Sequence, residues 1–153
     1  MSNRQPRNVV VLMGGPSAER EVSFSSGRAC AAALREHGYQ VTEMDAGADL
    51  ATRLIAIAPD VVFNALHGRL GEDGCVQGVL EWLQIPYTHS GVLASALAMD
   101  KQRSKEVFAQ VGLPIVKSII VPAADVRARH VMDAPYVVKP NSEGSSVGVY
   151  LVN

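Results

Sequence analysis

Short apolar runs alternate along this chain with longer segments of mixed polarity. Val9–Met13 and Asp60–Leu66 are apolar at almost every position and are followed by polar or glycine-rich residues, which is typical of strands buried on both faces. Further strands are predicted at Tyr39–Met44, Ile85–Thr88 and Ile115–Val121, and from Tyr136 and Val147. Helices are predicted at Ser25–His37, Asp49–Ala58, Val76–Gln84, Val92–Ala98, Lys101–Val111 and Ala124–Met132.

Strands that alternate with helices predict an α/β fold with a mostly parallel sheet and helices on both faces. Ligands of such sheets bind outside the carboxyl ends of the strands. Polar loops leave that edge after Met13, Leu66 and Val138. We expect three regions, a first domain at 1–120, a connector at 121–135 and the opening strands of a second domain at 136–153.

Composition narrows the class of protein. The chain has 153 residues, 48% of them apolar, which is typical of a globular protein. Its net charge is −1 and it has no basic tract, so we expect no nucleic-acid partner. The apolar run Val9–Met13 is too short to be a signal peptide or a membrane span, so we expect a cytoplasmic protein without a membrane partner. Cys30 and Cys75 lack metal-ligand spacing and are interpreted as reduced core residues.

Two loops of the first domain carry candidate chemistry. The loop Gly14–Ser23 presents Glu19, and a carboxylate at that edge suits an ammonium group better than a phosphate. A solvated charged turn is the plainer alternative. In the loop His67–Gly74, His67 or Arg69 is suited to binding a carboxylate or a developing negative charge. A structural hydrogen bond of the histidine remains open, and the acidic pair that follows it is equally suited to capping the next helix.

Two lysines are candidates for phosphate binding. Lys139 ends an apolar strand and is followed by a loop with two glycines and two adjacent serines, a composition suited to wrapping phosphate oxygens. Lys101 follows Asp100, a good N-cap, and the helix dipole disfavours a cation there. Free N–H groups at that helix start would bind an anion together with the lysine. The alternative for the loop after Lys139 is a Gly/Ser hairpin turn, and the alternative for Lys101 is an ordinary surface lysine.

Four segments together resemble the D-alanine–D-alanine ligase family of the ATP-grasp superfamily. They are GGPSAEREVS at 14–23, ALHGRLGEDG at 65–74, SGVLASALAMDKQRSK at 90–105 and VKPNSEGSSVGV at 138–149. Their order and spacing make the resemblance specific, and it covers nearly the whole chain. It implies a pre-ATP-grasp, Rossmann-like first domain followed by the first strands of an ATP-grasp domain.

The resemblance also implies residue roles. The family ligates two D-alanines with ATP through an acyl phosphate, for peptidoglycan. Glu19 is then the carboxylate for the first D-alanine's ammonium group, His67 lies near its carboxylate, and Ser145 links Glu19 to the substrate region; these three form the predicted catalytic set. The predicted nucleotide-binding residues are Lys101, Lys139, Glu143, Gly144, Ser145 and Ser146.

Members of the family are considerably longer, so the resemblance implies a truncated chain. No metal ligand is predicted within it, and the Mg²⁺ ligands are expected downstream of residue 153. We expect the chain alone to be inactive in a phosphate-release assay with ATP and D-alanine. A homodimer through the first domain is also implied. The alternatives are a D-alanine–D-lactate ligase, another ATP-grasp carboxylate–amine ligase, or a binding module for an amino acid without catalysis.

Overall fold

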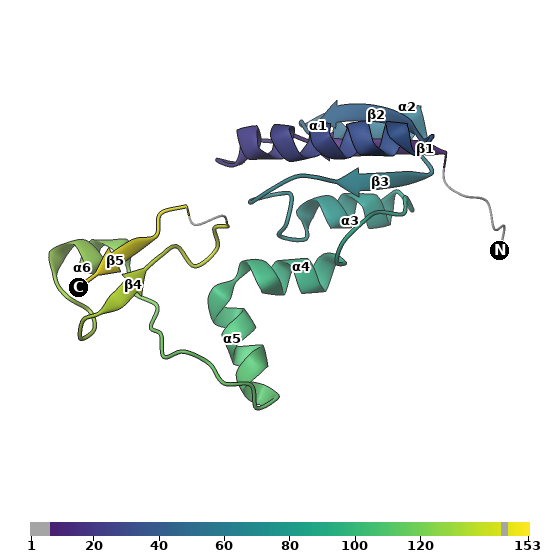
Figure 1. Ribbon diagram of the computed structural model, residues 1–153. Coiled ribbons are helices and arrows are strands. Elements are labelled where there is room, and N and C mark those ends of the chain that lie inside the picture. Colours follow the sequence, from purple (N-terminus) through teal and green to yellow (C-terminus); the bar gives the residue numbers. More distant parts are fainter. Residues whose placement is uncertain (1–6, 145–146) are drawn as a thin grey trace. The chain divides into compact units, whose positions relative to one another are not determined.

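A computed structural model of the chain describes residues 7–144 and 147–153. The chain divides into two compact units, residues 1–96 and 97–153. Residues 1–6 of the first unit lie outside the described part. Figure 1 labels the elements in chain order: β1 Asn8–Met13, α1 Arg20–Glu36, β2 Gln40–Asp45, α2 Leu50–Ile57, β3 Val61–Asn64, α3 Cys75–Trp82, α4 Val92–Met99, α5 Lys101–Gln110, α6 Ala123–Ala128, β4 Tyr136–Val138 and β5 Tyr150–Val152.

The first unit is built on a three-stranded parallel sheet in the order β2-β1-β3. Val10 of the central strand pairs with Thr42 on one side and with Val62 on the other. The predicted strand at 85–88 is reduced to one parallel bridge, between Val62 and Tyr87. The α/β class and the parallel sheet predicted from the apolar runs are confirmed.

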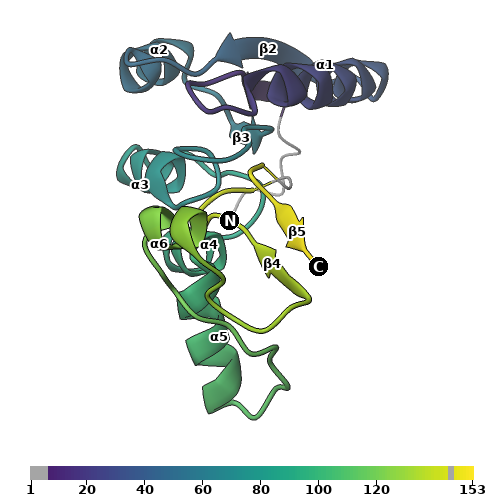
Figure 2. The same cartoon turned by 90° about the vertical axis from the view of Figure 1, so that its left-hand side faces the viewer.

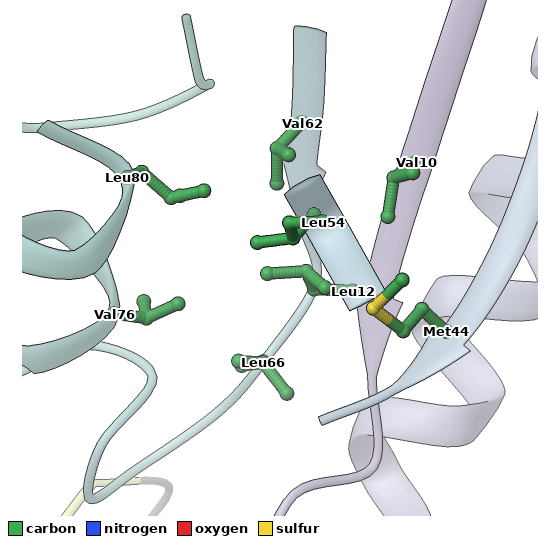
Figure 3. Packing of buried hydrophobic residues seen from close by; sticks show 8 residues of the cluster. All are labelled: Val10, Leu12, Met44, Leu54, Val62, Leu66, Val76 and Leu80. Atoms are coloured by element: carbon green, nitrogen blue, oxygen red, sulfur yellow. The ribbon is translucent and has the colours of Figure 1, made fainter. Parts of the chain in front are cut away.

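Helices cover both faces of this sheet. Alternate residues of β1 point to opposite faces, as the period of a strand requires. Val10 and Leu12 pack with Leu54 of α2 and Leu80 of α3, within the buried cluster that Figure 3 shows. The opposite face of the sheet packs on Ala31, Phe24 and Leu34 of α1, through Val9, Val11 and Met13.

Helix α3 has a buried side and an exposed side. Leu80 is fully buried in the cluster, whereas Trp82, two residues later, is 89% exposed. Cys75 opens the same helix and is exposed, and Cys30 is only partly buried, so the prediction of two core cysteines is wrong. Both thiols are free.

The second unit contains α5, α6 and an antiparallel pair of strands. Figure 2 shows β4 beside β5, and Tyr136 pairs there with Val152. The two strands predicted from Tyr136 and Val147 form, although the second begins at Tyr150 rather than at Val147, and their antiparallel pairing was not predicted. The strand predicted at Ile115–Val121 does not form. Within 97–144 and 147–153 no strand pairs with it, and its backbone therefore lacks a ladder.

Within the described residues, no helix is long and apolar enough to cross a membrane. The predicted domain boundaries near residues 120 and 135 remain predictions.

Candidate functional site

The loop after β1 turns sharply on two glycines. Gly14 and Gly15 both have φ of +73°, which side chains rarely adopt. A Cβ atom at Gly14 would lie 2.4 Å from an oxygen of Asp45, so a side chain there would displace the Asp45 carboxylate. Ser23 of α1 receives a hydrogen bond from the Gly14 N–H (2.9 Å) and donates one to the carbonyl of Ala65 (2.7 Å). Ser23 therefore ties this loop to the end of β3.

Asp45, at the end of β2, clips the same loop to the start of α1. Its carboxylate accepts two hydrogen bonds from the Arg20 guanidinium, at 2.8 and 2.5 Å, and one from the Gly15 N–H at 3.1 Å. The bonds from Arg20, more than that from Gly15, hold the pKa of Asp45 below its ordinary value, against the opposing effect of burial. Helix α1 begins at Arg20, five residues before the predicted start, because these contacts make residues 20–24 part of its first turns.

Glu19 is placed by this turn at the N-terminus of α1. Its side chain is only 4% exposed, and neither carboxylate oxygen has a hydrogen-bond partner among the described residues. A Cβ atom at Gly68 would lie 3.1 Å from Glu19 Oε1, so the carboxylate lies over the backbone of the second loop. Buried carboxylates are normally paired, and an unpaired one indicates a site for a cation or a hydrogen-bond donor.

His67 lies in the same region of the first unit as Glu19. The Ser17 hydroxyl donates to the His67 carbonyl (2.7 Å) and accepts from the Glu19 N–H (3.2 Å), which joins the two loops. The His67 ring lies 3.2 Å from Ser26 Oγ through Nε2 and 4.0 Å from a Glu72 oxygen through Nδ1. The fold therefore brings together Glu19 and His67, two of the three predicted catalytic residues.

The acidic pair after His67 is used locally. Glu72 accepts a hydrogen bond from the Gly68 N–H at 2.6 Å. Asp73 accepts from the N–H groups of Leu70 (2.9 Å) and Cys75 (3.1 Å). Burial opposes the ionisation of Asp73, but these N–H groups outweigh it and lower the pKa of Asp73. The capping alternative is thus correct for Asp73, while Arg69 is exposed.

In the second unit, Lys101 opens α5 as predicted, after the N-cap Asp100. Its ammonium group donates to the carbonyls of Glu143 (2.6 Å) and Asn141 (3.2 Å). The free N–H groups expected at this helix start are occupied. Arg103 N–H donates to Asp100, Gln102 N–H to the Asn141 side chain, and Lys101 N–H to the Asn141 carbonyl.

Lys139 follows β4 and is exposed. Neither its ammonium group nor that of Lys101 is paired with a carboxylate in the part of the chain that the structure describes. Glu143 and Gly144 follow in the loop, and the Gly144 carbonyl accepts a hydrogen bond from the Val147 N–H (3.0 Å). Lys101 reaches the carbonyl of Asn141, two residues after Lys139, so this unit brings both predicted lysines to one loop. Ser145 and Ser146 lie outside the described residues.

Sequence reasoning assigned no role to three residues that organise these sites. Asn141 caps α5, Asp45 clips the glycine turn, and Ser17 joins the two loops of the first unit. Asn141 lies directly after the Lys-Pro pair of the lysine-bearing loop, which was the available signal. Nothing local marked the contacts of Asp45 with Arg20 or of Ser17 with His67, because these partners lie 25 and 50 residues away along the chain.

Comparisons with known proteins point to one family. A family profile described as "D-ala D-ala ligase N-terminus" matches residues 49–90. A D-alanine–D-alanine ligase of Roseobacter denitrificans is 70% identical over 152 residues, which is 99% of this chain and 48% of that protein. The chain belongs to the D-alanine–D-alanine ligase family. The recognition made from the four sequence segments is therefore confirmed.

Solved structures of D-alanine–D-alanine ligase resemble this chain as well. The Bacillus anthracis enzyme is 37% identical, with a TM-score of 0.73 over 95% of this chain and 49% of its own. A structure of the B. anthracis enzyme complexed with ATP is 33% identical, with a TM-score of 0.70 over 97% of this chain and 51% of its own. The chain thus spans about half the length of the curated and solved D-alanine–D-alanine ligases that it matches.

Proposed function

We propose that the complete protein carrying this sequence is an ATP-dependent D-alanine–D-alanine ligase, which joins two D-alanines through an acyl phosphate for peptidoglycan synthesis. The curated relatives that match almost all of this chain bear that name. We place the enzyme in the cytoplasm because ATP, the proposed phosphoryl donor, is available there.

The observation that carries this proposal is the buried carboxylate of Glu19, which has no hydrogen-bond partner among residues 7–144 and 147–153. An ammonium group supplies both the charge and the hydrogen-bond donors that this carboxylate lacks. The imidazole of His67, from the adjacent loop, offers a polar group for the carboxylate of the same amino acid. An α-amino acid carries both charges on neighbouring atoms, which fits two loops joined through Ser17.

The proposed nucleotide-binding residues are Lys101, Lys139, Glu143 and Gly144, together with Ser145 and Ser146. Two ammonium groups unpaired with carboxylates in the described residues fit the charge of a triphosphate. ATP would supply the γ-phosphoryl group that activates a carboxylate for attack by an amine. We further propose Mg²⁺ as the partner of ATP. As the family resemblance implies, we propose that its ligands lie downstream of residue 153.

Incubation of the complete protein with ATP, Mg²⁺ and D-alanine tests the proposal. We expect phosphate release together with D-alanyl-D-alanine, identified by mass spectrometry. Glu19→Gln should raise the KM for D-alanine at least about tenfold, because hydrogen bonds to charged groups contribute about 1.5–3 kcal/mol. Glu21→Gln is the matched control, since Glu21 lies in the first turn of α1 but is exposed, and its substitution should leave that KM unchanged.

Other products would point to the alternatives. A depsipeptide formed from D-alanine and D-lactate, in preference to the dipeptide, would identify a D-alanine–D-lactate ligase. Calorimetric binding of D-alanine without any phosphate release would identify a binding module. Either result would overturn the proposed reaction.

The family resemblance also supports a homodimer through the first domain, which we include in the proposal. Light scattering of the complete protein measures its mass in solution, and a monomeric mass at micromolar concentration would contradict this part.

A further inference from the structure

The loop after Lys139 is fastened to the start of α5 through Asn141. The side-chain oxygen of Asn141 accepts from the Gln102 N–H at 3.0 Å, and its carbonyl accepts from the backbone N–H of Lys101 at 3.2 Å. The Lys101 ammonium group adds hydrogen bonds to the carbonyls of Asn141 and Glu143. Residues 39 to 42 positions apart in the sequence are thereby joined.

Asn141 acts here as a helix cap contributed from a distant segment. The first N–H groups of a helix have no partner within the helix and need one from outside. Asp100 accepts from the Arg103 N–H in the usual way, and Asn141 provides acceptors for the two N–H groups before it. Hydrogen bonds from Arg103 first, and from the Asn141 side chain second, lower the pKa of Asp100. Asp100 and Asn141 together therefore close this end of α5.

These hydrogen bonds leave the positive charge at the start of α5 unneutralised. The hydrogen bonds that Lys101 makes go to uncharged carbonyl oxygens, so they orient its ammonium group without neutralising it. Lys139 lies two residues before Asn141 in the same loop and is exposed. Fixing Asn141 thus limits the positions available to both ammonium groups at once.

We propose that Asn141 is a positioning residue for nucleotide binding, a role that rests on the proposed function. By capping α5 it holds the loop that carries Lys139 next to Lys101, so that both lysines meet one polyphosphate. A loop held in place before binding loses less conformational freedom when the anion arrives. Asn141 acts through these lysines and needs no contact with the nucleotide.

Steady-state kinetics of the complete protein tests this role. Asn141→Ala should raise the KM for ATP about fivefold, as expected for the loss of a helix cap. The KM for D-alanine should stay unchanged, because Asn141 acts through the lysines of the proposed nucleotide site, which are distinct from Glu19 and His67 of the proposed D-alanine site. Asn153→Ala is the matched control, since Asn153 has the same side chain and is exposed in the same unit. A rise in both KM values, or an equal effect of the control, would overturn the proposal.

A double-mutant cycle separates positioning from an independent effect. If Lys101 and Asn141 hold the same loop, Lys101→Met combined with Asn141→Ala should change the KM for ATP to within about twofold of the larger single effect. Effects that simply multiply would show that the two residues act separately, and the proposal would fail.

Hydrogen exchange of the complete protein, without nucleotide, gives a readout that does not depend on ligase activity. The Gln102 amide should exchange faster in Asn141→Ala, while the amides of β1 stay protected. Unchanged exchange at Gln102 would overturn the proposed positioning role of Asn141, even if the protein is an active ligase. Absence of dipeptide synthesis in the unsubstituted protein would instead overturn the proposed function.

Discussion

At the residue scale, the buried carboxylate of Glu19 lowers the stability of the unliganded chain but is suited to binding a ligand. The dipole at the N-terminus of α1 favours a negative charge there by about 0.3–1 kcal/mol. Removing a carboxylate from water without a partner costs several kcal/mol in real proteins, so the dipole offsets only part of that cost. The carboxyl group is nevertheless buried, and it finds no hydrogen-bond partner among the described residues. This imbalance is typical of a binding residue.

Glu19→Gln should therefore stabilise the unliganded chain. The neutral amide is cheaper to bury than the carboxylate, and we expect the free energy of unfolding to rise by about 1–2 kcal/mol. Urea unfolding at neutral pH, compared with Glu21→Gln as the exposed control, measures the difference. A less stable Glu19→Gln protein would mean that the carboxylate has a partner in the folded chain.

Asp45 should make the stability of the chain depend on pH in the acidic range. Its pKa is lowered in the folded state, so its contribution to stability is complete above its unfolded pKa of about 3.9 and is lost as the pH falls through the lower folded pKa. Asp45→Asn should destabilise the chain at pH 7, and the deficit should be smaller at pH 3, which lies below the unfolded pKa. Urea unfolding of both proteins at the two pH values tests the sign. An equal deficit at both values would contradict it.

The sequence was informative about single residues where chemistry is local. Glu19 and His67 were predicted from their positions after buried strands, and the fold brings them together. Asp100 was correctly predicted as an N-cap. Asn141 could not be assigned as a cap, because its partner Gln102 lies 39 residues earlier and no local pattern records that contact.

At the element scale, the turn between β1 and α1 depends on close packing at Gly14. Gly14→Ala should destabilise the first unit, because its Cβ would meet Asp45 at 2.4 Å and Phe24 at 2.8 Å. Gly38→Ala is the matched control, with a similar positive φ of +85° and nothing within 4 Å. We expect the free energy of unfolding to fall by about 1–2 kcal/mol in the control and by a further 1–3 kcal/mol or so in Gly14→Ala.

Chemical denaturation of the two variants measures this difference. Equal losses of stability would show that the backbone angle, rather than the packing around Asp45, makes glycine necessary at the turn.

Elements were predicted best where the apolar pattern is complete. The strands β1 and β3 were found because almost every position is apolar, as burial on both faces requires. The run Ile115–Val121 is also mostly apolar but forms no strand, because β structure needs a pairing partner and propensity alone does not supply one. The start of α1 was missed since its first turns contain polar residues that bind the glycine loop.

At the scale of the whole molecule, buried apolar side chains are unevenly distributed. In the described residues, those buried in the core all lie between Val9 and Leu80, in the first unit. Neither α5 nor α6 has a buried residue. Local opening costs least where few apolar contacts are lost, so the second unit should open more readily than the first.

Native-state hydrogen exchange of the chain tests this difference. Amides of β1 and β3 should exchange slowest, and those of β4 and β5 faster by at least about tenfold. Equal protection in both pairs of strands would show that the chain opens as a single cooperative unit.

The 89% exposure of Trp82 has a practical consequence for optical work on this protein. It is the sole tryptophan of the chain, so indole fluorescence comes from a surface already in contact with water. Emission should shift little towards the red when the core melts, and collisional quenchers should reach the ring in the native state. A blue shift would instead report a molecule settling over the outer side of α3, which makes this indole a native probe of association rather than of folding.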